Sequence, residues 1–417
     1  MRESISRLTE AEDLAPVLRA SLAHQEELRR FTLVLNPVEN FPFPSDLAVT
    51  AGNLHGLYNT DKVRSRDEQL ATDMQFAGRK AIALDSRRAY SAWATALGAA
   101  DATLRLLSGL QAHAVLFMSI ARPGQRVLQL PIRAGGHVVG SKILERLGLE
   151  VVQMVSNDAE MCVDMERTLA QCATHPPDYI FVDRSEGLVV EDFSALTTLD
   201  ALSIFDASQY LSNIIAGDHP NPFTAGFDLL VSSVHKNFPG PQKALLATRE
   251  VSDRWRALLS GVSTYVSNMH VASTYAATLT LGRSDWLMTY SKRMLSCAVL
   301  LEEKLIECGV PAVRRQADAV PTHHVWIREG SRQAAFDTFE ALERCGIFTN
   351  YRKLPYSLGF GVRLGLSAAA RIGLLETDVP RLAELIAAIR RFGPTDALQR
   401  DARAFNHGVW EQGTAAS

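Results

Sequence analysis

Short apolar runs alternate with helical patterns through the middle of the chain. Each run holds four to eight residues rich in Val, Ile, Leu or Phe and is bounded by turn residues. Strands that are apolar throughout and separated by helices are typical of a mainly parallel sheet with both faces covered. The pattern predicts an α/β domain with strands at 126–131, 151–155, 179–183, 203–206, 227–234 and 243–248.

The two flanking regions have different patterns. Residues 4–30 carry apolar positions at helical spacing, and a proline-rich segment, 36–44, follows them. Beyond residue 280 the pattern predicts helices at 285–308, 331–345 and 379–392 and strands at 323–327 and 361–365. We therefore expect three parts: a helical arm with a crossing segment (1–55), a large α/β domain (56–280), and a long helix with a smaller α+β domain (281–417).

The composition is that of a soluble globular protein with room for two or three cores. Of the 417 residues, 47% are apolar and 21% are charged, and 43 basic against 46 acidic residues leave a net charge of −3. This balance speaks against binding to nucleic acid or to an anionic membrane. The amino terminus lacks the apolar core of a signal peptide, and no stretch approaches the ~18 apolar residues of a membrane span.

The cysteines predict neither a disulfide framework nor a zinc site. There are five of them, an odd number, and none stands in a C-x-x-C motif. We expect free thiols in a reducing compartment. The protein is therefore expected to be cytoplasmic and to hold no metal.

The segment Phe227–Lys243 contains the most informative residues. Its apolar strand ends at His235 and Lys236, and a Pro/Gly turn follows. A lysine at the end of a buried strand can be kept away from water, which lowers its pKa and makes it a nucleophile toward an aldehyde. It could instead reach solvent from the strand end, so this segment alone leaves both interpretations open.

A carboxylate ends another predicted strand. Ser203–Asp206 is apolar up to Asp206, which lies thirty residues before Lys236. Pyridoxal phosphate chemistry needs such a pair, because a lysine binds the cofactor and an aspartate keeps its ring nitrogen protonated. Taken alone, Asp206 could equally cap a helix. The two strand ends together predict a pyridoxal phosphate site.

Further motifs make the chain resemble the serine hydroxymethyltransferases, which are fold-type-I pyridoxal phosphate enzymes. The resemblance covers nearly the whole chain, and six motifs stand in the family's order. Asp206 matches the family's ring-nitrogen aspartate, and Lys236 matches the lysine of its T-H-K motif. The other matches are Val38-Glu39-Asn40-Phe41 for S-E-N-Y, Pro123–Leu128 for P-G-D-x-V-L, Ala134-Gly135-Gly136-His137 for H-G-G-H, and Gly361-Val362-Arg363-Leu364-Gly365 for G-x-R-x-G.

The resemblance implies a role for each matched residue and a homodimer with shared active sites. His137 would stack on the cofactor ring, and Arg363 would bind the substrate carboxylate through its two-pronged guanidinium. Ser108, Gly109 and Gln111 match the family's S-G-S-Q, where a helix start suits a phosphate. Other predicted cofactor contacts are Ser185, Gln209, Ser233, Ser267 and Asn268, and the other predicted substrate contacts are Glu39 and Tyr58.

Some residues depart from the family pattern. The family's Y-A-E-G-Y-P-G-x-R-Y-Y carries a glutamate for proton transfer and a tyrosine pair beside the folate pterin. Here Tyr58 is kept, Thr60 stands at the glutamate position, and the tyrosine pair is missing. Asp61 could replace the glutamate only through a register shift. Gln209 stands where the family has a histidine at the cofactor's phenolic oxygen, and its neutral amide cannot gain a proton there.

Two variant motifs resemble the threonine transaldolases, a folate-independent branch. Gly240-Pro241-Gln242-Lys243 replaces G-P-R, and Ser267-Asn268-Met269-His270 replaces a diglycine. We therefore expect an aldolase or transaldolase that makes or breaks the Cα–Cβ bond of a β-hydroxy-α-amino acid through a glycyl quinonoid, with threonine or glycine as donor and an aldehyde as acceptor. The predicted catalytic residues are Lys236, His235, Tyr58 and Thr60.

Several alternatives stay open. One is a serine hydroxymethyltransferase with an altered folate pocket, and another is a different Cα-carbanion reaction, such as racemisation or decarboxylative condensation. A catalytically silent relative kept for binding or regulation would be indicated by loss of Lys236 or Asp206, and both are present. The basic run Lys62, Arg64 and Arg66 is expected to be a solvated face rather than a phosphate or acidic-substrate contact.

Overall fold

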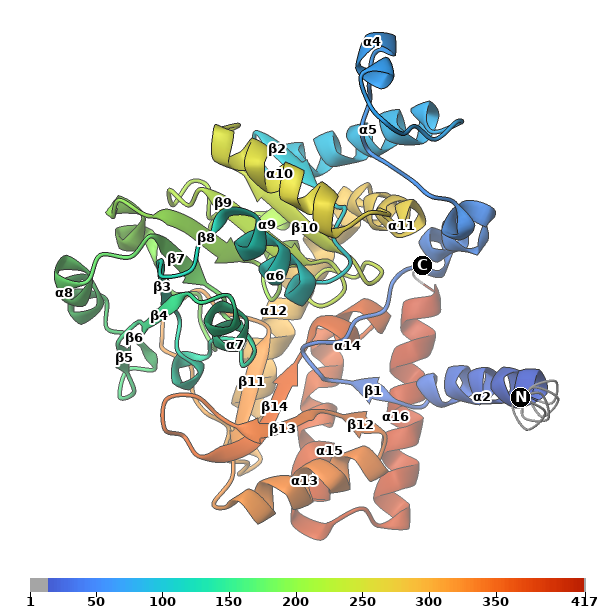
Figure 1. Cartoon of the computed structure of the whole chain (residues 1–417). Coiled ribbons are helices and arrows are strands. Elements are labelled where there is room, and N and C mark those ends of the chain that lie inside the picture. Colours follow the sequence, from blue (N-terminus) through green and yellow to red (C-terminus); the bar gives the residue numbers. More distant parts are fainter. Residues whose placement is uncertain (1–13, 416–417) are drawn as a thin grey trace, which may run out of the picture.

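A seven-stranded sheet forms the centre of the larger domain. The computed structural model describes residues 14–415 and places the strands in the order β2-β10-β9-β8-β7-β3-β4 (Figure 1). The strands from β9 to β4 are parallel to one another, and β10 runs antiparallel to both β9 and β2. Their bounds are β2 Asp101–Thr103, β3 Arg126–Gln129, β4 Glu150–Gln153, β7 Tyr179–Val182, β8 Leu202–Asp206, β9 Leu229–Ser233 and β10 Ala244–Thr248.

Both faces of the sheet are buried, which explains its continuous apolar strands. Along β9, Leu229 and Val231 pack in the core formed with α6 and α10, whereas Leu230 packs in the core on the other face, formed with α5, α9 and α12. Neighbouring residues alternate because successive side chains of a strand point to opposite faces. The helices of this domain are α5 Lys80–Leu97, α6 Gly109–Ile120, α7 Gly140–Arg146, α8 Met165–Thr174, α9 Leu211–Ala216, α10 Asp253–Tyr265 and α11 Val271–Leu281.

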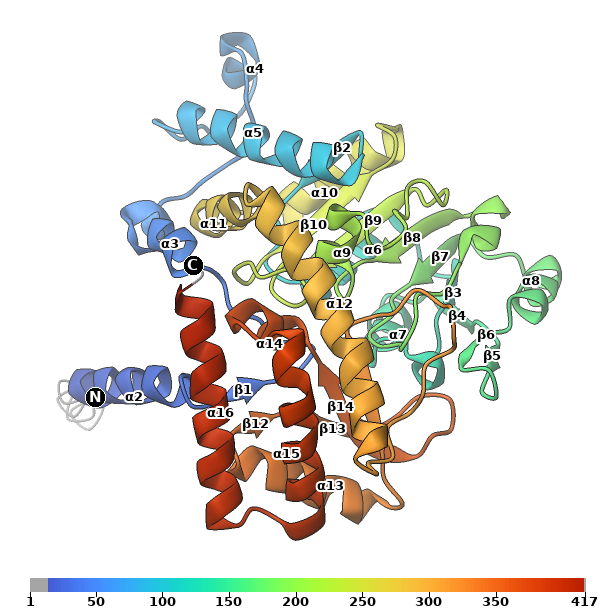
Figure 2. The ribbon, with the colours of Figure 1, turned by 180° about the vertical axis from the view of Figure 1, so that it is seen from behind.

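The long helix α12, Ser284–Glu307, runs from the larger domain to the smaller one (Figure 2). There a three-stranded sheet in the order β11-β14-β13 packs against helices. Its strands are β11 His324–Arg328, β13 Asn350–Lys353 and β14 Phe360–Gly365. The helices are α13 Arg332–Arg344, α14 Ser367–Ile372, α15 Val379–Phe392 and α16 Asp396–Ala415.

The amino-terminal segment crosses onto the smaller domain. Strand β1, Leu33–Val34, pairs in parallel with β12, Ile347–Phe348. Helix α2, Leu14–Arg29, belongs to the helix predicted at 4–30, and residues 4–13 of that prediction lie outside the described residues. The short elements are α3 Pro44–Leu47, α4 Arg66–Leu70, β5 Ser156–Asn157, β6 Cys162–Val163 and the 3₁₀ turns Ala48–Ala51, Asn53–Gly56, Ile132–Ala134, Ser194–Thr198 and Glu376–Asp378.

The mainly parallel sheet covered by helices confirms the predicted fold class. The domain boundaries at residues 55 and 280 stay predictions. Within residues 14–415, no helix is both long enough and apolar enough to cross a membrane. The five cysteines are all unpaired, and no cluster of three or more possible metal-ligating side chains occurs in the described part of the chain.

Candidate active site

The carboxyl ends of the parallel strands bring several predicted site residues together. Asp206 is the last residue of β8, and Lys236 lies three residues beyond the end of β9. The charges of Asp206 and Arg363 both act on the Lys236 amine, so the three groups lie within electrostatic reach of one another. Parallel strands end at the same edge of a sheet, where ligands of such folds bind. We call this group, with His137, the Lys236 cluster.

Asp206 is held as a carboxylate by a histidine that sequence reasoning missed. Nε2 of His113 lies 2.7 Å from Oδ2 of Asp206, and both residues are buried. Burial alone would raise the pKa of Asp206, but the hydrogen bond to His113 and the positive charge of Lys236 outweigh it and lower the pKa to about 2. Asp206 is therefore ionised at neutral pH and can hold a proton on a facing nitrogen.

Lys236 lies in a low-dielectric environment. Burial lowers the pKa of its amine; the Asp206 carboxylate opposes that effect and the Arg363 guanidinium adds to it. The backbone carbonyl of Lys236 accepts a 2.6 Å hydrogen bond from Nδ2 of Asn40, which fixes the loop that follows β9. A larger fraction of the amine is neutral at a given pH than for a solvated lysine, and the neutral amine is the nucleophile.

The two glycines before His137 are required by close backbone approaches. A Cβ on Gly135 would lie 2.2 Å from the carbonyl oxygen of Glu186, and one on Gly136 would lie 2.1 Å from that of Leu130. This packing fixes the turn that carries His137, whose ring meets the His113 ring edge to face at 6.0 Å. Burial, with the nearby His113 and Lys236, lowers the pKa of His137 to about 4, so its ring is neutral at pH 7.

The start of α6 presents groups that can bind a phosphate. Ser108 caps this helix by accepting the N–H of Gln111, and Gly109 lies so close to β9 that its Cβ would be 3.4 Å from Cβ of Ser233. The Ser233 hydroxyl is buried without a hydrogen-bond partner among the described residues. Free N–H groups at a helix start favour an anion. The side-chain oxygen of Gln111 accepts the N–H of Leu107 and supports this turn.

Arg363 lies on β14 of the smaller domain and faces a buried acid. Its Nη1 donates to the carbonyl of Ser185 at 3.4 Å and lies 3.7 Å from Glu186, whose carboxylate is also 2.6 Å from Arg352. Burial raises the pKa of Glu186, and the two arginines oppose that rise. The Nε of Arg363 has no hydrogen-bond partner in the described structure. Arg363 therefore has donor capacity left for a substrate carboxylate.

Gln209 is oriented by a second histidine that sequence reasoning missed. Oε1 of Gln209 lies 3.0 Å from Nε2 of His323, and both side chains are buried. This contact leaves Nε2 of Gln209 without a partner among the described residues. His113 gave only a weak signal, its position one helical turn after Gly109 on an otherwise apolar helix. His323 comes from a distant strand start and left no comparable signal.

Pyridoxal phosphate, the cofactor that the resemblance implies, fits these residues. An ionised aspartate, a buried lysine and a neutral flat ring stand together, and the start of α6 suits the phosphate. The unpartnered Ser233 hydroxyl and Gln209 amide are polar atoms that a bound polar group would satisfy. The individual contacts predicted for these residues stay predictions.

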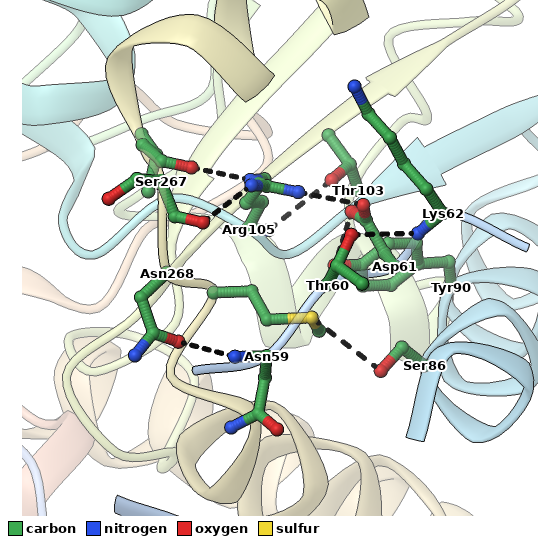
Figure 3. Close-up of polar contacts among 12 residues, drawn as sticks. Asn59, Thr60, Asp61, Lys62, Ser86, Tyr90, Thr103, Arg105, Ser267 and Asn268 are labelled. Carbon is green, nitrogen blue, oxygen red and sulfur yellow. Dashed lines mark hydrogen bonds and ion pairs between the residues drawn. The ribbon is translucent and has the colours of Figure 1, made fainter. Parts of the chain in front are cut away.

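Thr60, Ser267 and Asn268 belong to a second group of predicted site residues, shown in Figure 3. The backbone N–H of Asn59 donates to Oδ1 of Asn268, and Arg105 donates to the carbonyl of Ser267 at 2.8 Å. Tyr58 stacks on Phe76 with ring centroids 4.3 Å apart. Thr60 and Tyr58 line a pocket that shares no residue with the Lys236 cluster.

The acidic residues Asp61 and Glu39 differ in their surroundings. Oδ1 of Asp61 lies 2.8 Å from Nη1 of Arg105, and its Oδ2 accepts a hydrogen bond from Tyr90 at 3.2 Å, so both oxygens are engaged (Figure 3). Glu39 is exposed in a turn, whereas its neighbour Asn40 contacts the Lys236 loop. The substrate role of Glu39 stays a prediction.

Comparisons with known proteins find relatives of this chain. The family model described as serine hydroxymethyltransferase matches residues 79–386. A serine hydroxymethyltransferase of Pyrobaculum calidifontis is 27% identical over 412 residues, covering 96% of this chain and 94% of that protein. The fluorothreonine transaldolase of Streptantibioticus cattleyicolor is 29% identical over 299 residues, which cover 70% of this chain and 46% of that protein.

A solved structure shares the whole fold. The crystal structure of L-threonine transaldolase from Pseudomonas fluorescens, in its internal aldimine state, superposes with a TM-score of 0.89. The match covers 96% of this chain and 93% of that one at 20% sequence identity. At this identity the likeness shows the fold.

Proposed function

We propose that this chain, which belongs to the serine hydroxymethyltransferase family and is a pyridoxal-phosphate-dependent enzyme, works without folate. In this proposal it makes or breaks the Cα–Cβ bond of a β-hydroxy-α-amino acid, with threonine or glycine as donor and an aldehyde as acceptor. The resemblance predicted from the sequence motifs is confirmed by the family match. The fluorothreonine transaldolase among the relatives supports the folate-independent reaction.

The state of Asp61 is the observation that carries the proposal. The family's glutamate position is Thr60 here, and the neighbouring carboxylate of Asp61 is engaged by Arg105 and Tyr90. Both oxygens of Asp61 already have a partner within the chain, which disfavours Asp61 as the acid that moves a proton to or from a folate adduct. The segment therefore keeps Tyr58 for an acceptor and lacks the free acid that a folate-dependent transfer would use.

The residues of the Lys236 cluster suit aldol chemistry. Bound pyridoxal phosphate supplies an electron sink for negative charge at Cα. Arg363 would bind the donor carboxylate and thereby fix which Cα bond is broken. Asp206, ionised at neutral pH, would hold the proton on the ring nitrogen, and His137 would lie against the ring. Once released, the Lys236 amine is our candidate for moving the proton at Cα or at the β-oxygen, with His235 beside it.

A serine hydroxymethyltransferase activity is the second candidate. Five relatives that each cover 94–96% of this chain carry that name, at 24–27% identity. Under this alternative, serine cleavage would require tetrahydrofolate. An acid elsewhere in the site would then have to take the role of the family's glutamate, because that position is Thr60 here.

We also propose a homodimer in which each active site takes residues from both chains. In the described chain, Tyr58, Thr60, Ser267 and Asn268 form no hydrogen bond or ion pair with the Lys236 cluster, although the family resemblance assigns all of them to one site. Helix α4 (Arg66–Leu70) and the loop that carries it, which we call the α4 arm, stand away from the body in both views (Figures 1 and 2). Leu70 of this arm is 78% exposed, and a partner chain could cover it. Sedimentation of the holoenzyme tests this: a monomer that is fully active would contradict it.

The proposed reaction is tested with threonine and a panel of aldehydes in folate-free buffer. We expect acetaldehyde and a new β-hydroxy-α-amino acid in equal amounts, detected by mass spectrometry. Lys236→Ala serves as the control that should form neither product. If no aldehyde reacts and serine is cleaved only with tetrahydrofolate, the hydroxymethyltransferase candidate replaces this proposal.

A further inference from the structure

A pocket of about 280 Å³ lies between the α4 arm and the start of α5. Five of its lining side chains are cationic, and none of the lining residues that the structure describes is an aspartate or glutamate. Tyr58, Thr60 and Phe76 line it as well. We call it the basic pocket; its cationic residues are Lys62, Arg64, Arg79, Lys80 and Arg105.

Most of this positive charge has no counter-ion within the described chain. Arg105 is buried and neutralised by Asp61. Between residues 14 and 415, the side chains of Lys62, Arg79 and Lys80 form no ion pair, and Arg64 acts only at longer range on Glu68. The Nε of Arg79 is buried without a hydrogen-bond partner among these residues. Like charges gathered around one cavity repel, and an anion in the cavity relieves that repulsion.

The fold assembles the basic pocket from separate segments. Lys62 and Arg64 belong to the basic run that was expected to be a solvated face, whereas Arg66 does not line the pocket. Arg79 and Lys80 come from the start of α5, and Arg105 follows β2. Helix α5 has 18 residues and no side-chain cap at its amino terminus, so its free N–H groups add to the positive potential. The basic run in the sequence therefore contains only two of the five cationic residues of the pocket.

We propose that the basic pocket binds the anionic group, a carboxylate or a phosphate, of the acceptor aldehyde. This inference rests on the proposed function, because Tyr58 and Thr60, the residues expected on the acceptor side, line the same pocket. The stacked rings of Tyr58 and Phe76 offer an apolar wall for the body of the acceptor. The natural acceptor is then an acidic aldehyde rather than a simple alkyl aldehyde.

Binding is measured first, without turnover. The holoenzyme is titrated by calorimetry with inorganic phosphate and with benzoate, which separate the two anion chemistries. The double variant Lys62→Gln/Lys80→Gln should weaken the tighter of the two at least about tenfold. The matched control is Arg88→Gln on the same helix, because Arg88 pairs with Asp85 and does not line the pocket. Equal affinities in all three proteins, or no binding of either anion, would overturn the proposal.

Acceptor selectivity is measured next, with threonine as donor. The ratio of kcat/KM for 4-carboxybenzaldehyde to kcat/KM for benzaldehyde should fall about tenfold in the double variant and stay unchanged in Arg88→Gln. A loss of affinity for pyridoxal phosphate in the double variant, with an unchanged ratio, would assign the pocket to the cofactor phosphate and refute the proposal. If no aldehyde reacts, the proposed function fails, and the calorimetry still decides whether the pocket binds anions.

Discussion

The Lys236 cluster and the basic pocket balance their charges in opposite ways. In the cluster, Asp206 is paired with His113 at 2.7 Å and Arg363 lies 3.7 Å from Glu186, so both of these buried charges have a partner within the protein. In the basic pocket, Lys62 and Lys80 are exposed and unpaired among the described residues. A buried site whose charges are paired within the protein is preorganised for one reaction. A site with unpaired positive charges needs an anionic ligand to neutralise them.

This difference indicates that the cluster and the basic pocket have different roles. The cluster is built on strand ends of a rigid sheet, where the family shares its cofactor chemistry. Four of the five cationic residues of the pocket lie before α4 or at the start of α5, outside the sheet, where a change of residues alters the ligand without disturbing the sheet (Figure 1). The comparison predicts that changes in the cluster abolish the reaction and that changes in the pocket alter its acceptor.

Lys236→Ala should have the largest effect. It removes the amine that binds the cofactor and moves protons, so we expect activity to fall by at least about a thousandfold. The visible absorption of the lysine-bound cofactor should disappear in the same sample. Lys292→Ala, which changes an exposed lysine on α12, is the control and should keep both signals. Full activity of Lys236→Ala would remove Lys236 from the mechanism.

Asp61→Asn tests the buried ion pair between Asp61 and Arg105 beside the basic pocket. It leaves the buried Arg105 cation without its counter-charge, and we expect the free energy of unfolding to fall by about 3 kcal/mol. Asp85→Asn removes the partner of the exposed Arg88 and should cost less than about 1 kcal/mol. Urea unfolding of the two variants measures the difference. Equal losses would show that the arm is not held by this pair.

Arg363→Lys keeps the charge of the cluster and loses the two-pronged geometry. A lysine ammonium cannot make two parallel bonds to a carboxylate, and a lost charge-assisted bond of about 1.5–3 kcal/mol corresponds to a ten- to hundredfold fall in kcat/KM for the donor. Arg328→Lys on the neighbouring strand β11 is exposed and serves as the control. Donor kinetics unchanged in Arg363→Lys would exclude Arg363 as the carboxylate contact.

Much of the fold could be predicted because apolar runs determine buried strands. All six strands predicted in the larger domain are present, shifted by a few residues. The strands β2 and β13 were missed because they are short and contain charged or polar residues, Asp101 and Asn350 among them. Helix α16 was missed because its apolar positions are sparse and it contains Gly408 and Gly413.

The candidate site was predictable only where the chemistry follows a strand. Lys236 and Asp206 were located from strand ends, and the structure brings them together. His113 lies within an apolar helix, where a single polar residue resembles a satisfied core side chain. The basic pocket joins residues 62, 79 and 105, and their proximity depends on how the arm packs on α5. Periodicity along the chain carries no information about such long-range packing.

A buried histidine outside the Lys236 cluster, His219, should also make the stability of the protein sensitive to acid. Burial lowers the pKa of His219 to about 4, so between pH 4 and pH 6.5 the unfolded chain binds the proton more tightly than the folded one. The stability that His219 contributes is fully present above pH 6.5 and is lost as the pH falls toward 4, by about 2 kcal/mol at pH 5.

Urea unfolding at pH 7 and pH 5 checks this smallest effect. His219→Gln should reduce the difference in stability between the two pH values by about 1–2 kcal/mol. His175→Gln, which changes an exposed histidine, should leave the difference unchanged. A difference in stability between pH 7 and pH 5 that is equally large in the wild type and in His219→Gln would show that His219 does not contribute to it.

A tetrahydrofolate titration of threonine cleavage tests the central claim most directly. The initial rate of acetaldehyde release from threonine is measured with saturating pyridoxal phosphate while tetrahydrofolate is raised from zero, and serine cleavage is followed in parallel. We expect a threonine rate that is the same at every folate concentration and a serine rate that does not rise with folate. Threonine cleavage that is negligible beside a serine rate strictly dependent on tetrahydrofolate would contradict it.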